Sequence, residues 1–273
     1  MRDPPRVERE DRVRLTAPVC AGLLIAVVLL RVVVMPMLGL EVHFQRGIEA
    51  CSGLGLLLAA IAFDRGDPPR RPWSILATGL LLVPLARAAL ALKIMIADVA
   101  VGHMLLILTN ILCVIALLGF RKILISTGLT PEWTSGTRVR AVIIGSTIIA
   151  ASIALVSYHL SELGDPSTMS TSALISASVP PISIIADAVM FAVGLLLVRL
   201  VQPMMGGSVA LPYILVAVGG GVLLFVDLFS VVLKVTTQDQ FNSPVPLALA
   251  TLGWTAFALA GLSQRQLVRR SAR

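Results

Sequence analysis

Five ionisable side chains interrupt long apolar stretches of the sequence: Arg31, Glu49, Arg87, Asp187 and Asp227. A charge in the hydrocarbon of a bilayer is costly, so such residues normally face the interior of a helix bundle and pair with one another. In membrane proteins they often mark functional or assembly-critical positions. The sequence therefore predicts a polar centre inside a polytopic membrane protein, without identifying a ligand.

The positions of these charges place them at similar depths. At a rise of about 1.5 Å per residue, Asp187 lies near the middle of its stretch and Arg87 about 3 Å outside the middle of its own. Arg31, Glu49 and Asp227 each lie about 7–8 Å outside the middle of theirs. We therefore expect one charged layer in the outer half of the bundle. Its two bases and three acids can form a structural ion-pair network, or they can line a ligand or ion pocket.

The composition defines the class of protein. Of the 273 residues, 57% are hydrophobic and 14% are charged. Apolar stretches of about 20 residues, long enough to cross a hydrocarbon core of roughly 30 Å, recur along the chain. They cover residues 16–36, 45–63, 74–96, 100–120, 139–160, 175–200, 209–234 and 244–263. Such a chain leaves no polar helix faces for water. The sequence thus predicts an all-α fold, a transmembrane bundle of about eight helices.

The basic residues are distributed unevenly between these stretches. In an eight-span topology, 17 of the 22 Lys and Arg residues lie on one side, and the opposite connections hold only Arg46, Lys93 and Lys234. The positive-inside rule then predicts that both termini are cytoplasmic, and an odd number of spans would destroy the segregation. The net charge of +7 therefore favours anionic lipid headgroups as a partner, and nucleic acid is not expected.

The domain organisation follows from these boundaries. We expect a basic cytoplasmic segment at 1–15, a membrane domain at 16–263, and a basic cytoplasmic tail at 264–273 that prolongs the last helix. The connections are short, so no soluble domain is inserted between the spans. The ratio of 19 arginines to three lysines is typical of a GC-rich bacterial genome, and we expect a bacterial inner-membrane location.

Two parts of the membrane domain share a pattern. In the second and sixth stretches, an acid precedes a Gly-Leu-Leu-Leu run by six or seven residues: Glu49 precedes Gly55, and Asp187 precedes Gly194. In the third and seventh stretches, a charge precedes a lysine by a similar interval. Four helices separate the copies, which gives them the same orientation. The pattern predicts a parallel 4+4 duplication with halves at 16–120 and 139–263.

A sparse series of features runs from about residue 175 to 260. It consists of Pro180-Pro181, Asp187, the leucines 195–197, Asp227 flanked by Phe225 and Phe229, the segment Phe241-Asn242-Ser243-Pro244, and Gly253-Trp254. With these features the chain resembles the multi-span N-terminal sensory regions of bacterial diguanylate cyclases and sensor kinases. The resemblance implies a sensing membrane fold. Members of that family continue through a helical linker into an output domain, whereas this sequence ends at Arg273, so the signal and the output stay open.

Common catalytic motifs do not occur in the sequence. There is no Gly-x-x-x-x-Gly-Lys-Ser/Thr phosphate loop, no His-Glu-x-x-His zinc motif and no Gly-x-Ser-x-Gly elbow. We therefore expect neither catalysis nor a cofactor. Cys20, Cys51 and Cys113 lie in separate stretches and are interpreted as small buried apolar residues.

The three histidines all map to the outer side of the eight-span topology. Because His43, His103 and His159 lie near several methionines in depth, a copper or haem site is an alternative to ordinary interfacial histidines. No two of them have helical ligand spacing, so only tertiary packing can bring them together.

Glycine and proline predict local features of the helices. Gly219, Gly220 and Gly221 favour close helix packing. The prolines at 84, 180, 181 and 212 should kink or break their helices. Carbonyl groups freed by Pro180 and Pro181 can then line a polar cavity near Asp187.

These patterns favour an integral membrane sensor that acts without catalysis. In this interpretation a pocket in the outer half of the bundle changes the helix packing and signals to a cytoplasmic partner. One alternative is a small transporter or permease subunit for an ion or an anionic solute. Another is a structural subunit or assembly factor of a membrane complex. The expected partners are the lipid bilayer and a signalling protein or membrane complex, and homodimer formation is left open.

Overall fold

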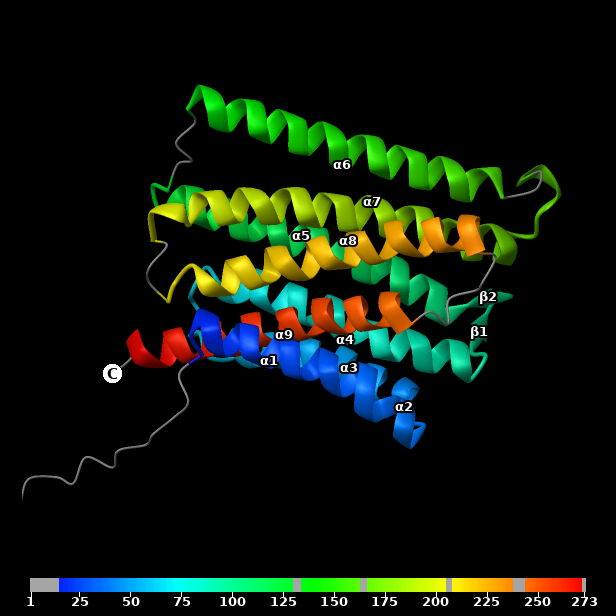
Figure 1. Cartoon of the computed structure of the whole chain (residues 1–273), viewed down its shortest axis with the longest axis horizontal. Coiled ribbons are helices and arrows are strands. Elements are labelled where there is room, and N and C mark those ends of the chain that lie inside the picture. Colours follow the sequence, from blue (N-terminus) through cyan, green and yellow to red (C-terminus); the bar gives the residue numbers. More distant parts are fainter. Residues whose placement is uncertain (1–14, 130–133, 163–165, 205–207, 238–243, 272–273) are drawn as a thin grey trace, which may run out of the picture.

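A computed structural model of the chain describes residues 15–129, 134–162, 166–204, 208–237 and 244–271. Figure 1 shows a bundle of long helices that run back and forth between two ends. The first is formed by α1 (Ala17–Leu29), a π-helical turn η1 (Leu30–Val34) and α2 (Met35–Leu38). The others are α3 (Glu41–Ala60), α4 (Arg70–Ala91), α5 (Val101–Ser126), α6 (Ser135–Ser161), α7 (Thr171–Leu200), α8 (Leu211–Thr237) and α9 (Pro244–Ser271). Short 3-10 turns η2 (Pro166–Thr168) and η3 (Gln202–Met204) lie beside α7.

The helical prediction is confirmed, and the number of spans is confirmed only in part. Seven segments of the described chain are long and apolar enough to cross a membrane, and they include every long helix except α3. The first half of α3 carries Glu41, Arg46 and Glu49, which lower its apolar character. An integral membrane protein with lipid-contacting helices is therefore supported, while the eighth span stays a prediction.

The third predicted span is wrong at its C-terminal end. It was expected to reach residue 96, but α4 ends at Ala91, where Lys93 adopts a left-handed conformation with φ of 51°. The N–H of Ile94 donates to the carbonyl of Ala89, and that of Lys93 to the carbonyl of Leu90, which is a Schellman cap. The apolar residues that follow form the strands β1 (Met95–Ile96) and β2 (Val99–Ala100) of a small hairpin. Hydrophobicity alone does not distinguish such a hairpin from one more helical turn.

The two ends of the bundle differ in what they contain. The helix α1 begins and α9 ends at one end, here named the terminal end, and the hairpin lies at the other, here named the hairpin end (Figure 1). The basic residues at 70, 71, 121, 122, 138, 140, 199, 269 and 270 lie in helices at or near the terminal end. This arrangement matches the expected segregation of charge.

Six helices form a closed ring of neighbours. The helix α3 packs against α4, α4 against α5, α5 against α7, α7 against α8, α8 against α9, and α9 against α3. Outside this ring, α1 packs on α9 and α6 packs on α7; Figure 1 shows α6 at the periphery of the bundle. The ring therefore encloses an interior in which the predicted charges can meet.

The ring order agrees only partly with the predicted duplication. Exchanging α3, α4 and α5 with α7, α8 and α9 preserves every contact in the ring. However, Gly55 meets Ala258 on α9, whereas Gly194 meets Ala217 on α8, so the two glycines contact helices that the exchange does not relate. The outer helices α1 and α6 also contact non-equivalent partners. The duplication stays a prediction.

Small residues allow the ring helices to approach closely. A Cβ at Gly55 would lie 2.7 Å from the carbonyl oxygen of Ala258, and a Cβ at Gly261 would overlap the carbonyl oxygen of Gly55. At Gly219 and Gly221 it would lie 2.8 and 2.7 Å from the rings of Phe257 and Phe191. The helix-packing interpretation of the glycines in α8 is therefore confirmed.

The prolines leave their helices uninterrupted. The helix α4 continues through Pro84, and α7 continues through Pro180 and Pro181. Pro212 is the second residue of α8, a position that tolerates the missing N–H. Because Pro84 has no N–H, the carbonyl of Leu80 loses its helical donor. The expectation that these prolines break their helices is thus wrong, while a local kink and the freed carbonyls beside Asp187 stay predictions.

The topology can be tested with reporter fusions. We expect fusions after residue 273 and within 161–171 to report opposite sides of the membrane, with the former cytoplasmic, because the basic connections stay inside. Alkaline phosphatase and green fluorescent protein fusions measure this. A periplasmic signal from the C-terminal fusion would contradict the eight-span topology.

The contact between α3 and α9 can be tested with one methyl group. Gly261→Ala should lower the free energy of unfolding by about 1–3 kcal/mol, because overpacking forces the two backbones apart. Gly145→Ala is the matched control, since its Cβ would meet nothing within 4 Å. Thermal unfolding in detergent measures both variants, and equal midpoints would refute the close contact.

Candidate functional site

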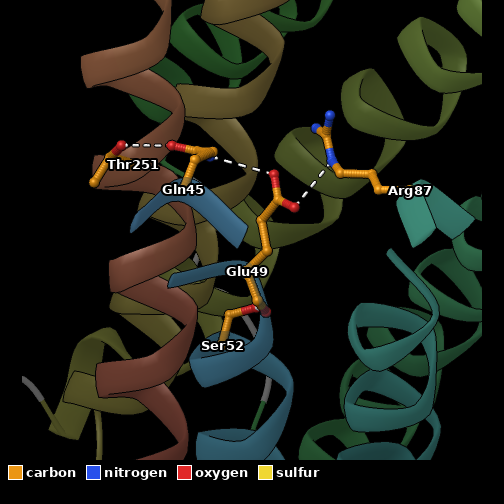
Figure 2. A network of polar contacts seen from close by, with 5 residues as sticks. All are labelled: Gln45, Glu49, Ser52, Arg87 and Thr251. Carbon is orange, nitrogen blue, oxygen red and sulfur yellow. Dashed lines mark hydrogen bonds and ion pairs between the residues drawn. The ribbon is translucent and has the colours of Figure 1, made fainter. Parts of the chain in front are cut away.

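A chain of polar contacts joins three ring helices near the hairpin end (Figure 2). The hydroxyl of Thr251 on α9 donates to Gln45 Oε1 on α3 at 2.8 Å. Gln45 Nε2 donates to Glu49 Oε1 at 3.3 Å. Glu49 Oε2 lies 2.9 Å from Nε of Arg87 on α4. The network therefore connects α9, α3 and α4 through one buried carboxylate.

The local helix geometry explains this arrangement. Gln45 and Glu49 are four residues apart on α3, so their side chains lie on the same face. Glu49 has no exposed surface, and a buried carboxylate requires a cation and hydrogen-bond donors. Arg87 and Gln45 supply them. Ser52 donates to the backbone carbonyl of Glu49 at 2.6 Å, which further fixes this turn of α3.

A cavity of about 700 Å³, here named the outer cavity, lies beside Glu49. It is lined by Arg31, Val32, Pro36, Glu41, Val42, Gln45, Arg46, Glu49, Arg87, Leu90 and Leu247. These residues come from η1, α2, α3, α4 and α9. Its wall thus combines three arginines and two glutamates with aliphatic side chains.

A second cavity of about 260 Å³, here named the inner cavity, lies among the ring helices. Its polar lining consists of Arg87, Thr109, Asn110, Ser183, Asp187 and Asp227. Apolar residues that include Leu80, Val83, Trp254 and Phe257 complete the wall. Arg87 therefore lines both cavities and separates an acid on α3 from two acids on α7 and α8.

The two aspartates occupy the interior as a facing pair. Asp187 is 6% exposed. Asp227 is half-buried, and its Oδ2 is hidden from the surface without a hydrogen-bond partner in the described chain. The two carboxyl groups lie close enough to interact across the contact between α7 and α8. Facing carboxyl groups in a low dielectric repel one another when both are ionised, so this pair favours a shared proton or a nearby cation.

The structure pairs Arg87 with one acid of the predicted layer. The depth of the charges allowed any acid of the layer to pair with Arg87, and the ion pair of Arg87 in the described chain is with Glu49. Asp187 and Asp227 share the inner cavity with Arg87 without forming an ion pair with it. The side chain of Arg87 is 51% exposed, whereas that of Glu49 is fully buried. Arg87 is therefore the solvent-accessible member of the pair.

Arg31 lies in the outer cavity and contributes a third cation. It sits in the π-helical turn η1, is 6% exposed, and its Nε has no hydrogen-bond partner in the described residues. The five predicted charges thus fall into two groups: Arg31, Glu49 and Arg87 at the outer cavity, and Arg87, Asp187 and Asp227 at the inner one.

Several polar residues of this site were not predicted from the sequence. The position of Gln45 could have indicated its role, because it precedes Glu49 by one helical turn and lies on the same face. Thr109 donates to the carbonyl of Gly79 at 3.1 Å and lines the inner cavity beside Asn110. Thr251 has no local signal, because a threonine hydroxyl is easily satisfied by its own helix, here the carbonyl of Leu247.

The three histidines line neither the outer nor the inner cavity. Within the described residues, no group of three His, Cys, Asp or Glu side chains is placed to hold a metal ion. The copper or haem alternative, which also uses methionine, stays a prediction. Cys20 and Cys113 are buried and free as expected, but Cys51 is exposed on the outside of α3, so its prediction as a buried residue is wrong.

No family model, curated protein or solved structure matches the chain. The resemblance to sensory regions of diguanylate cyclases and sensor kinases therefore stays an expectation. Fold and site define the class as an integral helical membrane protein with two polar cavities that meet at one arginine.

The coupling between Glu49 and Arg87 can be measured. Arg87→Met leaves a buried carboxylate without its cation, so it should lower the unfolding midpoint in detergent. Adding Glu49→Gln should recover part of that loss, because the buried charge is then removed. We expect an interaction free energy of about 1–3 kcal/mol from the double-mutant cycle. Additive effects of the two substitutions would contradict a direct pair.

Proposed function

We propose that the protein is a membrane receptor in which the partner of Arg87 changes with the state of the outer cavity and the change is passed to a cytoplasmic partner. One observation carries this proposal: Arg87 pairs with Glu49 while it also lines the cavity that holds Asp187 and Asp227. A single cation thus has acids on two sides. Signalling requires two discrete arrangements whose balance a ligand can alter.

The chemistry of Arg87 suits such an exchange. Its guanidinium keeps its charge and presents five donors, so it can pair with either acidic group without a change in protonation. When it pairs with Glu49, the cost of burying that carboxylate is offset, and the aspartate pair has no cation among the described side chains. When it turns toward the aspartates, Glu49 loses its cation. Each arrangement leaves the other acid uncompensated, which favours two separate states over a continuum.

The helix α9 is suited to transmit the change. It contacts α3 through the bond between Thr251 and Gln45 and through Gly261, and it also packs on α8. A shift of α3 or α8 is therefore passed to α9. The helix runs on to Ser271, as the tail prediction expected, and its last turns expose Arg269 and Arg270 at the terminal end.

The proposed tail is partly packed. Gln264 is 9% exposed, and the N–H of Leu15 donates to Gln266 Oε1 at 3.1 Å. Deleting residues 264–273 would therefore damage the bundle as well as remove a docking surface. Reversing the charge of Arg269 and Arg270 is the cleaner change for partner binding.

The receptor proposal predicts opposite shifts from two substitutions. Spin labels at Arg269→Cys and Lys122→Cys, in a Cys51→Ala background, report the separation of α9 and α5 at the terminal end. Glu49→Gln should shift the population toward the arrangement in which Arg87 meets the aspartates. Asp187→Asn with Asp227→Asn should shift it the other way. Double electron–electron resonance in nanodiscs measures the distances, and identical distributions in all three proteins would support a purely structural charge network.

A transporter is the second candidate, and the facing aspartates favour it. Buried carboxyl groups within membrane bundles often carry protons or ions along a transport route. Proteoliposomes with an internal pH dye and an imposed anion gradient test this directly. Flux that Asp187→Asn abolishes, with no change in the spin-label distances, would replace the receptor proposal by an ion-coupled transporter.

A further inference from the structure

Within the described residues, Arg31 is a buried cation without an ion-pair partner. Its side chain is 6% exposed, and its Nε has no hydrogen-bond partner within the described chain. Glu49 lines the same cavity as Arg31 but is paired with Arg87. The described residues therefore provide no ion pair for Arg31. Removing a charge from water without compensation is strongly unfavourable. The site is therefore incomplete as a structural charge network.

The backbone at Arg31 is also unusual. The first helix changes from α-helical to π-helical hydrogen bonding over Leu30–Val34 and returns to an α-helix at Met35. Isolated π turns occur frequently at functional sites, because the extra residue redirects a side chain. Here the redirected residue is a buried arginine that lines the outer cavity. Two independent observations thus point to the same position.

The outer cavity combines this cation with an apolar wall. Arg31, Arg46 and Arg87 face two acids, Glu41 and Glu49, which leaves one positive charge in excess. The remaining lining is mostly aliphatic: Val32, Pro36, Val42, Leu90 and Leu247. A volume of about 700 Å³ lies in the range that holds small organic ligands.

We propose that the outer cavity binds an amphipathic anion, with a carboxylate or phosphate group against Arg31 and an aliphatic tail along Val32, Pro36 and Leu247. The inference rests on the proposed function, because it names the ligand class of the receptor. A planar guanidinium is well matched to either anionic group. The same chemistry is offered by two sources: an anionic membrane lipid and a water-borne fatty acid.

A ligand in the outer cavity would also act on Arg87 through its charge. Arg87 lines the outer cavity beside Glu49, and Leu90 lies one turn further along α4. A bound anion therefore adds negative charge on the side of Arg87 that already faces Glu49. It biases Arg87 toward the outer cavity and away from Asp187 and Asp227.

Two binding experiments on the full chain distinguish the sources. In a neutral maltoside, octanoate should raise the unfolding midpoint, while octanol at the same concentration should not. In nanodiscs of phosphatidylcholine with phosphatidylglycerol, native mass spectrometry should detect phosphatidylglycerol retained by the protein. Stabilisation by octanoate alone indicates a water-borne acid, and retained phosphatidylglycerol indicates a lipid.

Variants at Arg31 decide whether this cavity is responsible. Arg31→Met should weaken octanoate binding by about thirtyfold or remove the retained lipid, because a buried charge pair is lost. The ligand-free variant should be at least as stable as the parent, since an uncompensated charge has been replaced by an apolar group. Arg71→Met is the matched control, an exposed arginine at the terminal end, and should bind like the parent. Should Arg31→Met fail to fold, Arg31→Lys should bind with intermediate affinity.

The proposal is overturned by two results. One is binding of neither octanoate nor phosphatidylglycerol, and the other is binding that Arg31→Met and Arg31→Lys leave unchanged. Octanoate binding without any change in the spin-label distances would refute the receptor mechanism and leave the ligand class intact. Distances that respond to Glu49→Gln in a protein that binds neither probe would refute the ligand class alone.

Discussion

The need to compensate Glu49 organises the centre of this bundle. A carboxylate with no exposed surface cannot stay ionised among apolar helices without a cation and donors. Arg87 and Gln45 meet that need, and Thr251 extends the network to α9. Three helices are thereby held in register by a requirement that lipid cannot satisfy. The rest of the ring can pack by shape, since small residues let its backbones approach closely.

The same requirement makes the centre suited to switching. The interior contains more acids than the one arginine between the cavities can pair, because Glu49 lies on one side and two aspartates lie on the other. A network with a surplus of acids has alternative arrangements of similar free energy. In the proposed receptor, an additional anion at Arg31 or a proton on the aspartates would change their balance. This is the physical link between buried charge and the proposed receptor function.

The sequence predicts the helices well because hydrocarbon thickness fixes their length. Each apolar stretch contains a helix, and the uneven distribution of basic residues agrees with the end at which α1 begins and α9 ends. The hairpin after α4 was missed because Met95 and Ile96 are as apolar as a helical turn. The choice of partner for Arg87 was also missed. The depth of the charges allowed Arg87 to pair with any acid of the layer. In the ring, α4 lies beside α3, which carries Glu49, and this neighbour relation selects the partner.

Other features depend on tertiary contacts that no local pattern encodes. Helical periodicity places Gln45 beside Glu49, but nothing in the sequence places Thr251 within reach of Gln45. The π-helical turn at Arg31 contains no proline or glycine, so no residue within it predicts the change in hydrogen bonding. The outer positions of α1 and α6 are likewise unexpected, since both are as apolar as the ring helices. Their places depend on tertiary contacts with α9 and α7, which hydrophobicity does not encode.

Arg87 is proposed to have two alternative acidic partners. An electron cryomicroscopy structure of the Glu49→Gln variant in nanodiscs tests this proposal most directly, because that substitution removes one partner and keeps its shape. The guanidinium of Arg87 should then lie within about 4 Å of a carboxylate oxygen of Asp187 or Asp227, the separation of an ion pair. A guanidinium that stays beside residue 49, with both aspartates unpaired, would contradict it.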